Sequence, residues 1–121
     1  MNKLGRRVAR PLATLADDGK IPREDVGAEY AGEWLADQDG QPTVRCGAGR
    51  LERVDGTRYV GGFEADRFHG KGELAYPGDD AQGRQAYVGL FANGQPHGQG
   101  ALLMLDGGRF DGTWEKGAPS G

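Results

Sequence analysis

The sequence predicts an all-β fold built from short antiparallel hairpins, and three observations support this prediction. First, an aromatic residue stands two positions before a glycine and four before a second aromatic residue, a pattern that occurs four times in the 121 residues. Second, a small glycine cluster follows each occurrence. Third, Asn-Gly and Asp-Gly pairs, which are strong hairpin signals, separate the alternating segments. Together these features form an internal repeat, and a repeat determines the architecture.

The four repeats share a length of 23 residues once two insertions are removed. They begin near residues 30, 59, 87 and 110. The insertions, of six and five residues, fall within residues 37–43 and 77–85. Both segments are rich in Gly, Pro, Asp and Gln, which form turns and loops. We therefore expect loops at the insertions and regular strands elsewhere.

The glycines inside the predicted strands need a physical reason, because glycine packs nothing and loses the most entropy on folding. We expect each aromatic ring to lie over a glycine of a neighbouring strand, where a Cβ atom would clash. The rings would then form the core of a single-layer sheet, and any ring left partly exposed is a candidate for partner binding. The eight rings are Tyr30, Trp34, Tyr59, Phe63, Tyr87, Phe91, Phe110 and Trp114.

Residues 30–121 resemble MORN repeats, whose pattern is close to Tyr-x-Gly-x-Trp, a turn, His-Gly-x-Gly and Asp-Gly-x-x-Tyr in a 23-residue unit. The second and third repeats, from Tyr59 to Arg109, match best. In the first, Arg45-Cys46-Gly47 replaces His-Gly, and the fourth is half a repeat. The resemblance implies an elongated, twisted antiparallel sheet of consecutive hairpins, often curved into a groove. It also implies a non-catalytic scaffold that binds a protein or peptide or self-associates.

Residues 1–29 form an N-terminal extension without the repeat. Apolar residues recur in it at helical spacing, and basic residues fall on roughly the opposite face. We expect a short amphipathic helix or an irregular cap, although Pro11 argues against one continuous helix. Three interpretations stay open: a cap on the sheet, a docking element, and a membrane anchor. The apolar residues are Leu4, Val8, Leu12 and Leu15, and the basic candidates for membrane or partner contact are Lys3, Arg6, Arg7 and Arg10.

Composition narrows the class of partner. The net charge of −3 and the pI near 5.3 do not favour nucleic acid. A neutral or basic peptide suits the acidic array better than an anionic lipid does. The sequence has no run of 18 apolar residues, and its single cysteine, Cys46, fits a reducing compartment. We therefore expect a cytoplasmic protein that binds proteins, with peripheral membrane binding or service as an accessory subunit of a separately encoded enzyme as alternatives.

No catalytic, metal or cofactor site is predicted. His69 and His97 occupy equivalent repeat positions, so packing near a turn explains them better than a metal or acid–base pair does. Two histidines and Cys46 are a poor zinc set, because structural zinc sites need four ligands.

The half-repeat at residues 110–115 predicts an edge strand. Unpaired edge groups invite pairing with another chain. We therefore expect homodimerisation through this edge, or the addition of a partner's strand.

Overall fold

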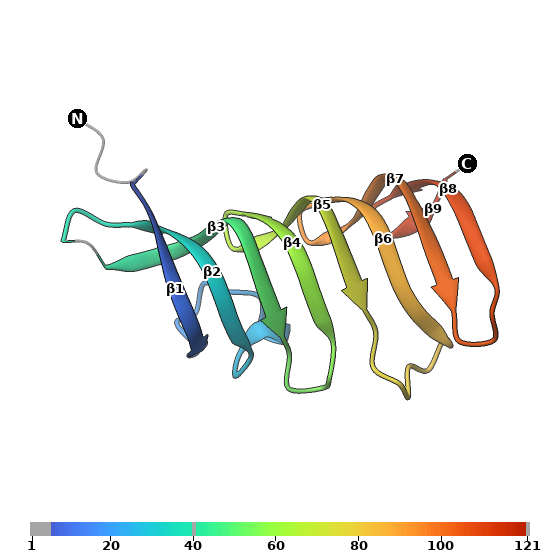
Figure 1. Ribbon diagram of the computed structural model, residues 1–121, viewed down its shortest axis with the longest axis horizontal. Coiled ribbons are helices and arrows are strands. Elements are labelled where there is room, and N and C mark those ends of the chain that lie inside the picture. The colour runs from blue at the N-terminus through green and yellow to red at the C-terminus, as the bar shows by residue number, and fades with distance from the viewer. Residues whose placement is uncertain (1–5, 40, 121) are drawn as a thin grey trace.

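A computed structural model describes residues 6–39 and 41–120, which form one open, twisted antiparallel sheet (Figure 1). Each of its nine strands pairs with the next along the chain. The predicted array of consecutive hairpins is therefore confirmed. The strands are β1 (Arg6–Thr14), β2 (Glu29–Ala36), β3 (Pro42–Glu52), β4 (Arg58–Glu64), β5 (Arg67–Ala75), β6 (Arg84–Ala92), β7 (Gln95–Met104), β8 (Arg109–Glu115) and β9 (Ala118–Pro119).

The predicted N-terminal helix is wrong. Residues 6–14 instead form β1, which pairs with β2 from Arg6 opposite Ala36 to Thr14 opposite Glu29. Pro11 gives one reason, because proline inside a helix removes a hydrogen bond and clashes with the preceding turn. The strand accommodates it at a bulge between Arg10 and Ala13, where the ladder is already interrupted. Residues 1–5, including Lys3 and Leu4, lie outside the described residues.

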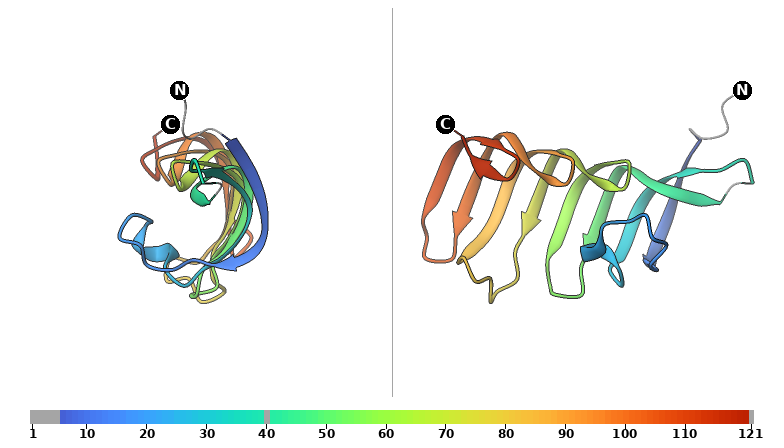
Figure 2. Two further views of the ribbon diagram at one scale, coloured as in Figure 1. Left: turned by 90° about the vertical axis from the view of Figure 1, so that its left-hand side faces the viewer. Right: turned by 180° about the vertical axis from the view of Figure 1, so that it is seen from behind.

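The segment between β1 and β2 folds back toward the inner face of the sheet. Its ends are joined where Leu15 N donates to Ala28 O and Gly27 N to Leu15 O, each at 2.8 Å. A single turn of 3₁₀ helix, η1 (Arg23–Asp25), lies within it. Viewed along its long axis, the sheet curves into an open trough with this segment at the lower lip (Figure 2). Leu15 and Ala28 join the core there.

Glycines line up across the middle of the sheet. Each is the register partner of the next on the neighbouring strand, and we call this line the glycine row. Without Cβ atoms, the strands leave room along this line for side chains from the inner face. The glycine row consists of Gly32, Gly49, Gly61, Gly72, Gly89, Gly100 and Gly112.

A second line of register partners, the apolar row, runs parallel to the first. It alternates between the first aromatic residue of each repeat and a leucine, and it ends on β1 at an alanine. Most of its members are buried on the inner face, and this line is the core of the sheet. The apolar row consists of Ala13, Tyr30, Leu51, Tyr59, Leu74, Tyr87, Leu102 and Phe110.

The predicted Asn-Gly turn is present, since Asn93 and Gly94 both have positive φ values, of 53° and 82°. Lys116 and Gly117 form a similar turn, with values of 51° and 85°. Such turns match the twist of the flanking strands. A further turn has positive φ values of 51° at Ala65 and 67° at Asp66. Alanine is not typical of this conformation, so its presence at the first position did not predict the turn.

Candidate functional site

Seven of the eight predicted rings form one continuous chain along the inner face. Each tyrosine contacts the second aromatic residue of its own repeat and that of the next repeat edge to face. For Tyr59 the ring centroids lie 5.3 Å from Phe63 and 5.1 Å from Phe91. Edge-to-face pairs at such distances add stability beyond burial alone. In order, the chain is Trp34, Tyr30, Phe63, Tyr59, Phe91, Tyr87 and Trp114.

The tyrosine rings of this chain are fixed by the glycine row. Tyr59 Oη donates to Gly62 O at 2.7 Å, so the ring lies back over the row. A Cβ atom on Gly72 would come within 2.6 Å of Cε1 and Cζ of Tyr59. Tyr30 covers Gly49 and Tyr87 covers Gly100 in the same way. The expectation that rings lie over neighbouring glycines is therefore confirmed for the three tyrosines.

Burial has a further effect on these tyrosines. It raises the pKa of the Tyr30 and Tyr59 hydroxyls well above the usual value, because the charged form would lose its water. Both rings are almost completely buried. Their hydroxyls donate to backbone carbonyls of their own repeats, so neither ring is presented to a partner.

Phe110 is the exception among the eight rings. Its side chain is 57% exposed, although it occupies the position of the buried tyrosines in the apolar row. It lies on β8, whose outer edge is paired with β9 only at Trp114 and Glu115. A backbone hydrogen bond from Ser120 N to Thr113 O continues this pairing by one residue. Among the described residues, no strand pairs with the outer edge of β8 from Arg109 to Gly112.

An arginine takes the place of a ring near the other end of the array. Trp34 pairs with Arg45, as Phe63 pairs with Phe68 and Phe91 with Pro96. The Arg45 side chain is fully buried, and its guanidinium carbon lies 5.7 Å from the Tyr30 ring centroid and 5.3 Å from that of Phe63. The planar cation thus packs between rings as a ring would.

Two aspartates neutralise this buried cation. Arg45 Nη1 lies 3.0 Å from Asp25 Oδ2, and Arg45 Nε lies 3.0 Å from Asp66 Oδ1. Asp25 also accepts from Arg53 Nε at 2.8 Å. Asp25 belongs to η1, so the network ties the N-terminal segment to the sheet. The reasoning from sequence missed it, and the one available signal was Arg45 at the repeat position where Phe68 and Pro96 stand.

The basic N-terminal candidates do not form a helical face. Lys3 lies outside the described residues. Arg6, Arg7 and Arg10 are residues of the strand β1. No strand among the described residues pairs with the outer edge of β1. Beside it, on the inner face, is a cleft of about 440 Å³. Its apolar lining is provided mainly by Leu12, Leu15, Ile21 and Trp34.

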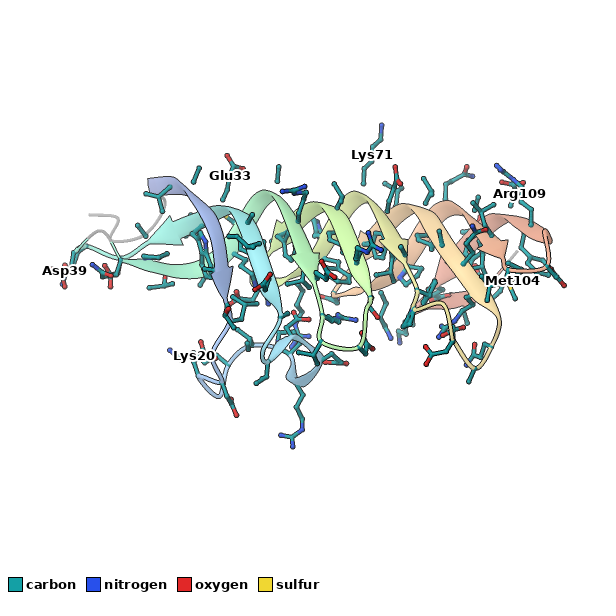
Figure 3. All side chains as sticks on the ribbon, turned by 60° about the horizontal axis from the view of Figure 1, so that its bottom comes forward. Lys20, Glu33, Asp39, Lys71, Met104 and Arg109 are labelled. Carbon is teal, nitrogen blue, oxygen red and sulfur yellow. The ribbon has the colours of Figure 1, made fainter. Side chains whose placement is uncertain are left out.

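Other polar residues of the repeats form hydrogen bonds or ion pairs, or face solvent. Glu33 Oε1 accepts from Ala48 N at 2.9 Å, and Glu64 Oε1 lies 3.0 Å from His69 Nε2. Glu33, Lys71 and Arg109 project from the outer surface of the sheet (Figure 3). Cys46 is buried. In the described part of the chain, no group of three or more His, Cys, Asp or Glu residues could hold a metal ion.

Comparison with known proteins agrees with this geometry. The family model described as the MORN repeat matches residues 59–80 and 87–109, which are the second and third repeats. These stretches contain the most regular part of the ring chain, whereas Arg45 interrupts the first repeat. No curated protein matches the chain, and none of the described helices is long and apolar enough to cross a membrane. The chain thus contains two matched MORN repeats, and together with the ring chain and the glycine row they are consistent with a MORN-repeat protein of a few repeats.

Proposed function

We propose that the protein is a non-catalytic, cytoplasmic interaction module that binds another protein strand at the outer edge of β8. The family is consistent with this role, because MORN repeats are generally protein- or membrane-binding modules. The observation that carries the proposal is Phe110, an exposed ring on a strand with an unpaired edge.

Two properties of the β8 edge favour the addition of a strand. Its backbone between Arg109 and Gly112 supplies hydrogen-bonding groups to an extended chain. Phe110 supplies apolar area, and a buried aromatic side chain covers roughly 150–250 Å². Leu102, its neighbour in the apolar row, is partly buried and extends the apolar surface inward. A partner strand would therefore complete the core as an additional strand does elsewhere in the array.

The inner groove, by contrast, offers little free aromatic surface. Seven of the eight rings form the inner chain and are buried or partly buried, and the pockets of the described groove are lined by a mixture of polar, charged and apolar residues, including Arg53, Arg67 and Lys116. Membrane binding through an N-terminal amphipathic helix also loses its basis, because residues 6–14 form a strand. These two observations favour the edge over the groove and over lipid.

Sedimentation velocity over a wide range of protein concentrations tests self-association through β8. We expect the native chain to associate, Phe110→Asp to stay monomeric, and Val54→Asp to behave as the native chain. Val54 is a suitable control because it is also an exposed apolar residue, at 77%, but lies in a turn away from β8.

Selection from a displayed peptide library tests the addition of a foreign strand. Peptides enriched on the native protein should lose binding to Phe110→Asp and keep it to Val54→Asp. A chain that is monomeric at every concentration, and from which no Phe110-dependent peptide is selected, would overturn the proposal.

A further inference from the structure

The two ends of the sheet match each other. The outer edge of β8 is unpaired from Arg109 to Gly112, and the outer edge of β1 has no partner among the described residues. Because all neighbouring strands are antiparallel, β1 and β8 run in opposite directions. A second copy could therefore place its β1 beside β8 and continue the same alternation, with the same face turned inward.

The apolar row sets a register for this contact. The row begins at Ala13 on β1 and ends at Phe110 on β8, so a continuous row places Phe110 opposite the next copy's Ala13. Ala13 is exposed and lines the 440 Å³ cleft together with Leu12, Leu15 and Trp34. The indole Nε1–H of Trp34 is buried there without an acceptor among the described residues. An exposed ring at one end thus meets an apolar cleft at the other.

Charge disfavours the symmetric contact between two β1 strands. Residues 6–14 carry three arginines and no acid, so pairing β1 with β1 would bring six arginines together. Like charges facing each other across strands are destabilising. The free stretch of β8 carries one arginine and one acid, Arg109 and Asp111, so it meets the arginines of β1 without a net positive charge of its own.

We propose that β8 of one copy pairs with β1 of a second copy, so that the chains associate head to tail. This rests on the proposed function of the β8 edge and names its partner as another copy of this chain. Such a contact is heterologous, so it generates an open series of copies rather than a closed dimer. The bulge with Pro11 and the short free stretch of β8 limit the ladder, so the association is reversible and depends on concentration.

Two variants that each block one end provide the test. Phe110→Asp leaves only the β1 edge competent, and Ala13→Asp leaves only the β8 edge competent. Both positions are exposed in the single chain, so circular dichroism and thermal melting should show folded proteins. Each variant alone should be monomeric, and an equimolar mixture should form a 1:1 complex with twice the mass of one 12.9 kDa chain.

The same experiment separates the possible failures. Dimers of Ala13→Asp alone would show pairing of β8 with β8; this would overturn the head-to-tail contact and leave the β8 edge as a binding site. A monomeric mixture, with an associating native chain, would also overturn it. A native chain that is monomeric throughout would refute self-association itself.

A disulfide trap checks the register independently of affinity. Mixing Ala13→Cys with Phe110→Cys under mild oxidation should give covalent heterodimers, because register partners in a sheet lie within disulfide range. The native Cys46 is buried. A mixture of Ala13→Cys with Val54→Cys is the matched control and should give none. Equal cross-linking in both mixtures would contradict the register.

Discussion

At the scale of single residues, the glycines of the glycine row and the tyrosines pack together as one unit. Gly72 leaves the space that the Tyr59 ring fills, and the ring is held there by its bond to Gly62 O. The ring provides the burial that the glycine lacks. This explains why the sheet can have an apolar core although the described residues form no second layer of helices or strands over it.

Replacing a row glycine by alanine should therefore be costly. We expect Gly72→Ala to lower the free energy of unfolding by about 1–3 kcal/mol or more, the range for an overpacked core. Gly78→Ala is the control, because a Cβ atom there meets nothing within 4 Å, and it should change the value by less than about 0.5 kcal/mol. Urea denaturation measures both. Equal effects would mean that the row glycines act through the unfolded chain rather than through packing.

The buried Arg45 network makes a second residue-scale prediction. Asp25→Ala should cost about 3–5 kcal/mol, because it leaves a fully buried cation with one aspartate fewer. The exposed pair Arg109–Asp111, with 59% and 62% of the side chains exposed, provides the contrast. Arg109→Gln should leave the melting temperature nearly unchanged, because exposed ion pairs contribute little to stability. Thermal melts at low protein concentration, below any self-association, compare the two.

The residue scale also shows what the sequence could and could not predict. The ring positions and the glycines were predictable because they repeat every 23 residues. The Asp25–Arg45–Asp66 network was not, because its members occur once each and come from η1, β3 and a turn. The half-repeat predicted an edge strand at residues 110–115, but the sequence grouped Phe110 with seven other rings, and the register was needed to show that its neighbours leave it exposed.

At the scale of elements, β1 shows how tertiary pairing overrides local periodicity. Leu4, Val8, Leu12 and Leu15 have helical spacing, but a helix at residues 6–14 would have had to contain Pro11. As a strand, residues 6–14 extend the ladder of β2 along nearly its whole length. Propensity is a weak guide where such pairing is available.

The loop between β5 and β6 is stabilised by one carboxylate. Asp80 accepts hydrogen bonds from Arg84 Nη2 at 2.7 Å and from Arg84 N at 2.9 Å. The Arg84 guanidinium in turn lies 4.1 Å from the Tyr76 ring centroid. The bonds from Arg84 hold the pKa of Asp80 well below its usual range. The inserted segment is thus an ordered connection between two repeats.

This pKa shift predicts an acid-dependent contribution to stability. Because the folded pKa of Asp80 is lower than the unfolded value of about 3.9, its contribution is complete above that value and is lost as the pH falls below it. Asp80→Asn should lower the melting temperature by a few degrees at pH 7, the scale of about 1 kcal/mol. The difference from the native chain should shrink below about pH 4. A difference that stays constant down to pH 2 would contradict the role of the charge.

At the scale of the whole molecule, the array is a one-dimensional series in which each strand contacts mainly its neighbours. Stability in such arrays is approximately a sum of unit and neighbour terms. The central strands β4, β5 and β6 have a neighbour on both sides and carry buried rings of the core. The ends have one neighbour each. At the N-terminal end the Arg45 network and the folded-back segment add further contacts, whereas at the other end of the described sheet β8 is followed by the two-residue strand β9 alone.

Hydrogen exchange at two protein concentrations tests this gradient and the head-to-tail contact together. At low concentration, amides of β4–β6 should exchange only with global unfolding, while those of β8 exchange through local opening at a much lower free energy. At high concentration, protection should rise selectively in β1 and β8, since these strands form the contact between copies. Phe110→Asp should abolish that rise and leave the central protection unchanged. A rise confined to β8 would indicate symmetric pairing instead, and a uniform rise along the array would mean that neighbouring copies stabilise the whole sheet rather than its two edges.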